Sequence, residues 1–391
     1  MLMKSRTTFL LLLNLPAACV MANTGSAFYG DPPDETHAWS IHDRNRPQPP
    51  LVTPGTFSSQ EHPGKPPSDA VVLFDGTEAT LSNWVADKNP AEPTKWIVKD
   101  GALQCVPGAG YIKTKAEWGD CQLHVEWSAP AKVAGNSQGR GNSGVFLMGL
   151  TEVQVLDNFN NPTYPDGFAG SVYGVSPPMA NPLVAPGQWQ VYDIIFRRPV
   201  FKDGKELEPG RLTVLINGVI AQDATPLEGG GGHMGRSKSR PFPEKGPLKL
   251  QDHGNPVRYR NVWYRPLPPR AVEGGTDGQL SPEAAATKKK EIAAGLREKA
   301  EKAAGKDKLL GLMESLCYDQ DAAAAEQVNK LSSDWLAAAK ASKGEGMKGE
   351  IMQLRGAFNY MNNHKFLPAD HPAKGGIAAI INERGWDEKK E

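Results

Sequence analysis

The sequence predicts a mainly β protein, an antiparallel sandwich, followed by a small C-terminal α-helical domain. Short runs rich in β-branched and aromatic residues recur from Val71 to Tyr264 without intervening helices, separated by Gly, Asn and Asp. Asn217-Gly218 lies between two of these runs and is the strongest short-range signal for a β-hairpin. After Pro269 the composition changes to Ala, Lys and Glu, which favour helix.

The amino terminus has the residue order of an export signal. Lys4 and Arg6 precede an apolar run from Phe9 to Leu15, and small residues follow. The run is too short to span a bilayer, so no stable membrane span is expected. We therefore expect residues 1–27 to be a signal peptide and the mature chain to be periplasmic or extracellular.

Two positions suit cleavage of this signal, after Ala22 or after Ala27. Lipid attachment at Cys19 is the alternative. Pro16 stands where a lipobox usually carries leucine, which disfavours that alternative.

Residues 28–69 contain Pro-Pro, Pro-Gly and polar clusters with hardly any apolar periodicity. A segment of this composition offers too little apolar surface to form a core of its own. We expect a Pro-rich disordered tether.

The sandwich is expected at residues 70–268. Alternation of polar and apolar residues marks its strands, and turn residues bound them. The predicted strands are Val71–Phe74, Trp96–Val98, Gln122–Trp127, Gly144–Met148, Glu152–Leu156, Tyr192–Phe196, Leu212–Ile216, Val219–Gln222 and Val257–Tyr264.

A linker at residues 269–280 leads to a predicted helical domain at residues 281–391. Ser281-Pro282-Glu283 combines an N-cap, a first-turn proline and an acid that suits the helix dipole. Two apolar faces recur at helical spacing, Val328, Leu331 and Trp335 on one and Ile351, Leu354, Phe358 and Met361 on the other. We interpret these faces as the domain's own core; docking of a protein partner is the alternative.

The charge balance excludes a general attraction to polyanions. The 391 residues contain 44 Lys and Arg and 44 Asp and Glu. Without a net field no nucleic acid partner is expected, and the partner is expected to be small or uncharged.

Three cysteines remain after removal of the signal, at positions 105, 121 and 317. Export would permit a disulfide between Cys105 and Cys121, which lie in adjacent strand-like segments. Two unpaired core residues are the equal alternative. No cysteine or histidine spacing indicates a structural zinc site.

The segment Glu152–Asp157 is an unusually polar strand. With a side-chain period of two, Glu152 and Gln154 share one face, and Val153 and Val155 share the other. The strand therefore offers a carboxylate and an amide while its other face joins a core.

An ordered set of motifs carries a family resemblance over roughly residues 70–268. The motifs are Leu73-Phe-Asp-Gly76, Trp84, Trp96 with Asp100-Gly101, Asn142-Ser-Gly-Val145, Glu152-Val-Gln-Val-Leu-Asp157, Gly187-Gln-Trp-Gln190, Leu215-Ile-Asn-Gly-Val219, Leu250-Gln-Asp-His-Gly254 and Arg260-Asn-Val-Trp263. In this order they resemble the 3-keto-disaccharide hydrolase family, formerly the domain of unknown function 1080. The resemblance implies a concanavalin A-like jelly-roll sandwich, the architecture of many lectins and glucanases.

The resemblance also implies an enzyme that cleaves glycosides already oxidised to a ketone at C3 of the sugar. Such a ketone acidifies the C2 hydrogen, so the C1 substituent can leave by elimination, and hydration then completes net hydrolysis. This route needs a base, an acid and a donor for the enolate oxygen. Direct hydrolysis is the other route.

Glu152 and His253 are the expected catalytic residues. Glu152 lies on the polar face of its strand, and a histidine has an ordinary pKa close to working pH. Each has a structural alternative: a solvated strand carboxylate for Glu152, and a hydrogen bond to its own turn for His253. Asp157 is expected to bond loop backbone.

The expected substrate-binding residues are Asn142, Gln154, Tyr173, Gln251 and Arg260. Arg260 would polarise the ketone or enolate, and Tyr173 would stack on a sugar ring. Asn142 has the alternative of shaping its turn, and Tyr173 that of a core aromatic.

Glycines 229–232 resemble a phosphate cradle only superficially, because no lysine follows at P-loop spacing. We interpret this loop as a flexible lid. No cofactor is certain; a divalent metal held by Glu152, His233 and His253 is an option that their spacing does not demand.

A competing hypothesis is a noncatalytic, lectin-like carbohydrate-binding module, because fold does not determine function. It expects saturable sugar binding without turnover.

Overall fold

The computed structural model describes residues 27–275 and 278–386. Nearly all of the predicted signal peptide, with Cys19, lies outside the described residues. The chain divides into two compact units, one of residues 49–277 and one that joins the residues up to 48 to those from 278 onwards. No helix within the described ranges is both long enough and apolar enough to span a membrane.

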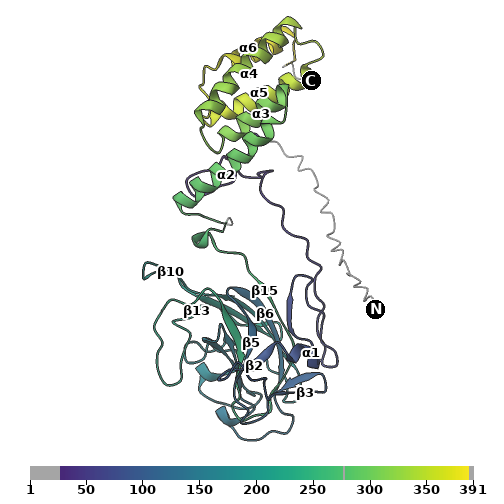
Figure 1. Ribbon diagram of the computed structural model, residues 1–391, viewed down its shortest axis with the longest axis vertical. Coiled ribbons are helices and arrows are strands. Elements are labelled where there is room, and N and C mark those ends of the chain that lie inside the picture. Colours follow the sequence, from purple (N-terminus) through teal and green to yellow (C-terminus); the bar gives the residue numbers. More distant parts are fainter. Residues whose placement is uncertain (1–26, 276–277, 387–391) are drawn as a thin grey trace, which may run out of the picture. The chain divides into compact units, whose positions relative to one another are not determined.

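The unit of residues 49–277 is an antiparallel β-sandwich (Figure 1). Its strands are β1 (Val71–Phe74), β2 (Trp84–Ala86), β3 (Ile97–Lys99), β4 (Ala102–Gln104), β5 (Ile112–Trp118), β6 (Cys121–Ser128), β7 (Ser143–Leu147), β8 (Thr151–Val155), β9 (Gln190–Arg197), β10 (Val200–Lys202), β11 (Lys205–Glu208), β12 (Arg211–Ile216), β13 (Val219–Pro226), β14 (Gly246–Leu250) and β15 (Arg258–Pro266). A short helix, α1 (Glu78–Leu81), follows β1.

Two sheets form the layers of the sandwich. The eight-stranded sheet has the order β13-β12-β9-β6-β15-β4-β3, with β1 also paired to β15. The five-stranded sheet has the order β2-β5-β14-β7-β8, and β10 and β11 form a separate hairpin. All pairs are antiparallel, so the predicted fold class is confirmed.

All nine predicted strands are present, with ends shifted by at most four residues. The hairpin at Asn217-Gly218 is confirmed, because Ile216 pairs with Val219 and both turn residues have positive φ. The strands not foreseen are short or polar; β5, for example, has the sequence IKTKAEW. Their polar residues face solvent, which weakens the apolar alternation that the prediction relied on.

The hydrophobic core lies between the two sheets and is rich in aromatic residues. Its largest fully buried side chains are Trp84, Trp96, Trp127, Tyr192, Tyr259, Phe74 and Phe196. Val153 and Val155 of β8 belong to this core, as their alternation predicts. Cys105 and Cys121 are buried and unpaired, so the second of the two alternatives for these cysteines is confirmed.

The expectation of a disordered tether at residues 28–69 is corrected by the contacts of this segment. Residues 49–69, here called the strap, lie on the sandwich, where Ser58 and Gln60 bond Glu126 and the Trp189 backbone. The strap turns back on itself through hydrogen bonds from Thr56 to Lys65 and from Ser59 to His62. Polar side chains and backbone atoms make these contacts, so the low apolar content of the strap did not reveal them.

Residues 27–48 belong instead to the helical unit. Arg44 and Asn45 bond the carboxylate of Glu314, which is buried. The backbone amide of Leu280 donates to the carbonyl of Thr36 at 2.8 Å. The helical domain is therefore built from both ends of the described chain.

The helices of this unit are α2 (Pro282–Glu301), α3 (Gly305–Leu316), α4 (Ala322–Ala341), α5 (Lys348–Asn363) and α6 (Pro372–Glu383) (Figure 1). Ser281 caps α2 by accepting from the Ala284 amide, and Pro282 opens the helix, as predicted. The predicted face of α5 is fully buried, and α4 buries Val328 with Leu331 and Trp335 packed beside it. These faces form the unit's own core.

Candidate active site

A cavity of about 460 Å³ lies on the face of the five-stranded sheet that is turned away from the core. This volume falls in the range of small-molecule sites. The cavity is lined by Tyr111, Gln138, Asn142, Phe146, Leu150, Glu152, Gln154, Tyr164, Tyr173, Gly230, Gly231, Gly232, His233, Gln251 and His253. Apart from Leu150, Phe146 and the glycines, every lining residue carries a polar group.

The pairing of β7 with β8 places the carboxylate of Glu152 above the neighbouring strand. Phe146 is opposite Glu152, and Gly144 is opposite Gln154. A Cβ atom added to Gly144 would lie 2.2 Å from Oε1 of Glu152. The missing side chain of Gly144 therefore provides the space in which the carboxylate lies.

Burial of Glu152 changes its ionisation. Removal from water raises the pKa of this carboxyl from its ordinary value of 4.5 to about 8. Within the described residues no hydrogen bond or ion pair of its side chain offsets the burial. Glu152 is therefore mostly protonated at pH 7 and able to donate a proton inside the cavity.

The raised pKa predicts a pH-dependent stability. Between pH 4.5 and pH 8 the folded chain retains a proton that the unfolded chain has lost, so the free energy of unfolding falls as pH rises, by up to about 1.4 kcal/mol per pH unit. Urea unfolding of the wild type and Glu152→Gln at several pH values measures this slope. The difference between the two proteins should shrink toward low pH and grow toward pH 8. Parallel pH profiles would contradict it.

An amide network forms one wall of the cavity. Nε2 of Gln154 donates to Oε1 of Gln138 at 3.0 Å, and Nδ2 of Asn142 donates to the Gln138 carbonyl at 2.7 Å. Nε2 of Gln251 donates to the hydroxyl of Tyr111 at 2.8 Å.

These bonds leave two buried acceptors without partners. Oε1 of Gln154 and Oε1 of Gln251 have no hydrogen bond within the described residues. A buried carbonyl oxygen without a donor costs roughly 1 to 3 kcal/mol, which a ligand hydroxyl would relieve. The cavity is thus suited to a ligand that carries several hydroxyl groups.

A chain of hydroxyl and imidazole groups forms another polar part of the cavity wall. The hydroxyl of Tyr164 lies 2.6 Å from that of Tyr173, which lies 3.1 Å from Nδ1 of His233. Burial and the hydrogen bond with Tyr164 raise the pKa of Tyr173, so this phenol keeps its proton at neutral pH. The hydroxyls of this chain can serve as hydrogen-bond donors.

Core tyrosines hold the strands of the site in place. The hydroxyl of Tyr192 donates to the Gln154 carbonyl at 2.7 Å. The hydroxyl of Tyr259 donates to Oγ of Ser143, which in turn donates to the Gln251 carbonyl, each at 2.6 Å. The site residues on these strands are therefore held in place by core hydrogen bonds, which favours a fixed geometry of the site.

The glycine-rich loop closes one side of the cavity. Gly231 has φ of 83°, and a Cβ atom there would lie 2.1 Å from the carbonyl oxygen of Tyr173. Only glycine permits this backbone approach. In the structure the loop is a wall of the cavity; its opening as a lid stays a prediction.

The structure brings together all but one of the predicted site residues. Asn142, Glu152, Gln154, Tyr173, Gln251 and His253 all line the cavity. His253 lies exposed at its edge, and within the described residues its imidazole has no hydrogen bond. Asp157 instead pairs with Arg140 and accepts from the Phe159 amide, the structural role that was expected.

Arg260 is the exception, and its predicted role at the site is wrong. It lies on β15 of the eight-stranded sheet, where Nε donates to Oε2 of Glu126 at 2.7 Å. Its other nitrogens bond the backbone of the strap. The guanidinium is on the outer face of the other sheet and does not line the cavity.

Sequence reasoning missed Tyr111, Gln138 and Tyr164 and assigned His233 only to a metal. These residues come from loops without periodic pattern, so no local signal identified them. Among the described residues no three His, Cys, Asp or Glu side chains could together hold a metal ion. Glu152, His233 and His253 share the cavity but do not form a ligand set.

Comparisons with known proteins match the sandwich. The model of the 3-keto-alpha-glucoside-1,2-lyase-like domain matches residues 69–265. No curated protein matches the chain.

Three solved structures illustrate the similarity. A candidate glycosyl hydrolase from Parabacteroides distasonis ATCC 8503 is 42% identical over 57% of this chain and 93% of its own, with a TM-score of 0.53. A second one from the same organism is 22% identical over 51% of this chain and 99% of its own, with a TM-score of 0.37. The alginate lyase Aly36B is 12% identical over 51% and 94%, with a TM-score of 0.31.

Proposed function

The chain belongs to the 3-keto-alpha-glucoside-1,2-lyase-like family, and from that membership we propose that it cleaves the glycosidic bond of 3-keto-glycosides. The observation that carries the proposal is the buried carboxyl of Glu152, which has a pKa raised to about 8 and no hydrogen bond within the described residues, beside two buried amide acceptors. An acid is needed where the leaving oxygen departs, and the acceptors suit sugar hydroxyls. The family match, which spans half of the chain, supports the ketone as the reactive group.

The proposed first step is an elimination. His253 removes the C2 proton, and the electron pair of the C–H bond forms the enolate of the C3 ketone. When the enolate returns to the ketone, the C1–C2 double bond forms and the C1–O bond breaks. Glu152 donates its proton to the leaving oxygen. The hydroxyls of Tyr164 and Tyr173 supply hydrogen bonds to the enolate oxygen at C3, where charge develops.

Addition of water across the C1–C2 double bond would complete a net hydrolysis. If water does not add, the reaction ends as a lyase reaction. Direct displacement at C1 is the other route to the hydrolysis product. It normally uses two carboxylates that flank the bond, and Glu152 is the only carboxylate among the described residues that line the cavity.

Turnover of a chromogenic 3-keto-glucoside tests the proposal. We expect 4-nitrophenol release from 4-nitrophenyl 3-keto-glucoside and little from the matched unoxidised glucoside. In heavy water, elimination with hydration should leave deuterium at C2 of the product. Saturable binding without release would instead indicate a lectin-like module, and equal rates on both substrates would exclude a role for the ketone.

Export is a separate proposal, supported by the basic, apolar and small residues that follow one another at the amino terminus. It would place the reaction in the periplasm or outside the cell. Docking of a protein partner by the helical unit also stays a prediction.

A further inference from the structure

The outer face of the eight-stranded sheet carries a second group of polar residues. Holding the covering segment in place would not require so many of them. Leu123, Val125 and Trp127 of β6 point into the core, so His124 and Glu126 lie on the outer face. Both are buried there, and Glu126 is 0% exposed. The strap covers them.

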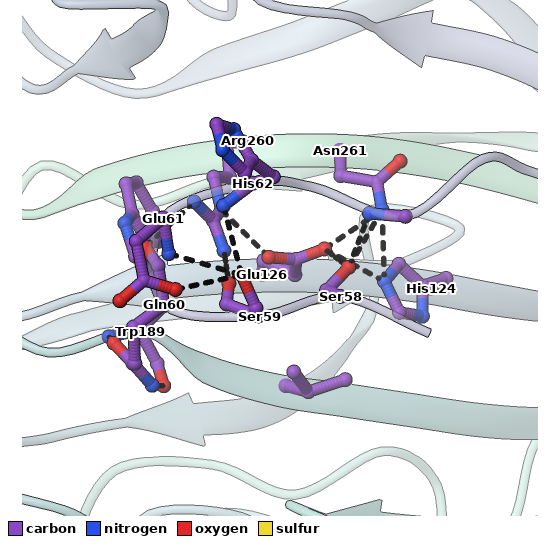
Figure 2. A network of polar contacts seen from close by, with 12 residues as sticks. Ser58, Ser59, Gln60, Glu61, His62, His124, Glu126, Trp189, Arg260 and Asn261 are labelled. Atoms are coloured by element: carbon purple, nitrogen blue, oxygen red, sulfur yellow. Dashed lines mark hydrogen bonds and ion pairs between the residues drawn. The ribbon is translucent and has the colours of Figure 1, made fainter. Parts of the chain in front are cut away.

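Figure 2 shows Glu126 between Arg260 on one side and Asn261 with His124 on the other, with Ser58 and Ser59 of the strap over them. Nδ2 of Asn261 donates to Oε1 of Glu126 at 2.7 Å. All of these residues belong to the same compact unit.

Beside this network, the strap and the sheet enclose a second cavity of about 660 Å³. Its lining includes Phe57, His124, Trp189, Asp193, Arg260 and Trp263. It lies on the outer face of the eight-stranded sheet, whereas Glu152 lies on the outer face of the five-stranded sheet. The two cavities are therefore on opposite sides of the sandwich.

Two ion pairs form the floor of this second cavity, and the exposed Lys65 lies at its edge. Burial tends to lower the pKa of His124, but hydrogen bonds to Asp193 and Glu126 outweigh it and raise the pKa to about 9. His124 is thus cationic at neutral pH and lies 2.7 Å from Oδ1 of Asp193. Arg260 and Glu126 form the second ion pair. A floor of two cations and two anions favours a neutral polar ligand over a charged one.

The cavity also presents one aromatic ring that the fold leaves exposed. Phe57 is 104% exposed although Thr56 before it and Ser58 after it both make hydrogen bonds. The indole of Trp263 is stacked on His124, and its buried Nε1 has no hydrogen-bond partner within the described residues. An exposed aromatic ring next to hydrogen-bonding groups suits a ligand with apolar ring faces and hydroxyl edges.

We propose that this cavity is a second, noncatalytic saccharide site that takes a neutral, unoxidised oligosaccharide. Phe57 packs against a sugar ring at the cavity's edge. Asp193, the strap carbonyls and the unpaired Nε1 of Trp263 bond its hydroxyls. The site is independent of turnover at Glu152, so it does not depend on the proposed reaction.

Isothermal titration of cellotriose, maltotriose and xylotriose into the full chain tests this site. We expect saturable binding of at least one trisaccharide, weakened tenfold or more in Phe57→Ala and in Asp193→Asn. Because Phe57 is fully exposed, its replacement leaves the fold intact. Leu51→Ala is the matched control, since Leu51 is equally exposed on the strap and does not line the cavity.

Binding should persist in Gln154→Ala, which alters only the first cavity. Three results would overturn the proposal: no saturable binding by any of the three sugars, equal affinity in the wild type, Phe57→Ala and Asp193→Asn, or loss of binding in Gln154→Ala. The last result would place the sugar in the first cavity. None of them bears on the turnover of 3-keto-glucosides.

Discussion

Replacement of Glu152 by glutamine should reduce kcat for a 3-keto-glucoside roughly 100-fold to 10,000-fold, the usual contribution of a positioned acid or base. Glutamine has nearly the same shape, so it fits the space above Gly144 but has no carboxyl proton to donate. Because the lost interaction acts in the transition state, KM should change little. Initial rates of 4-nitrophenol release over a range of substrate concentrations measure both constants.

Glu117→Gln is the matched control for this substitution. Glu117 lies on β5 of the same sheet, is exposed and does not line the cavity, so its replacement should leave kcat and KM unchanged. The wild-type rate should also depend on the protonated form of Glu152 and fall as pH rises past about 8. If Glu152→Gln keeps the wild-type kcat, the carboxyl of Glu152 has no role in the mechanism.

Replacement of Arg260 by alanine should destabilise the sandwich by about 3 kcal/mol, the low end for a broken buried ion pair, because it removes one of the two cations beside the buried carboxylate of Glu126 and leaves only His124. The strap carbonyls of Ser59 and Gln60 would lose their donors in the same step. Urea unfolding followed by tryptophan fluorescence measures the change. Material that remains folded should keep the wild-type kcat, since Arg260 does not line the first cavity.

Arg258→Ala serves as the control. Arg258 lies two residues away on the same strand, where it contacts the ring of Trp189, as Arg260 also does. It makes no ion pair in the described chain, so its replacement should cost about 1 kcal/mol or less. If Arg260→Ala abolished turnover while its unfolding curve matched that of the wild type, the result would support a catalytic role for Arg260.

The error over Arg260 arose because no local pattern shows which sheet a strand joins. Alternation correctly places Arg260 on the face opposite the core residue Tyr259, but β15 belongs to the eight-stranded sheet. A bulge adds Asn261 to the same face, although strict alternation would have placed it with Tyr259. The pairing of β15 with β6 shifts register between Arg260 and Trp263, and Asn261 has φ of 48°, which marks a bulge. Both residues therefore lie on the outer face and bond Glu126.

The strap shows a second limit of local patterns. It has no apolar periodicity, and hydroxyls, amides and carbonyl oxygens attach it to the sheet. Partners such as Ser58 and Glu126 are separated by 68 residues, and nothing in either segment indicates the other. Low apolar content showed only that the strap has no core of its own.

The sequence by itself determined the sandwich, the helical domain and the polar face of β8 with Glu152 and Gln154, because alternation along a strand and caps at a helix start are local properties. Only the tertiary structure decided which sheet each strand joins, and with it which polar residues meet. It places Tyr111, Gln138, Tyr164 and His233 in one cavity with Glu152, and it places Arg260 on the other sheet. A cavity is formed by loops and strands from different parts of the chain, and no local pattern encodes which of them lie close together. It also decided the ionisation of Glu152, because the pKa of a carboxyl depends on the burial that distant residues impose.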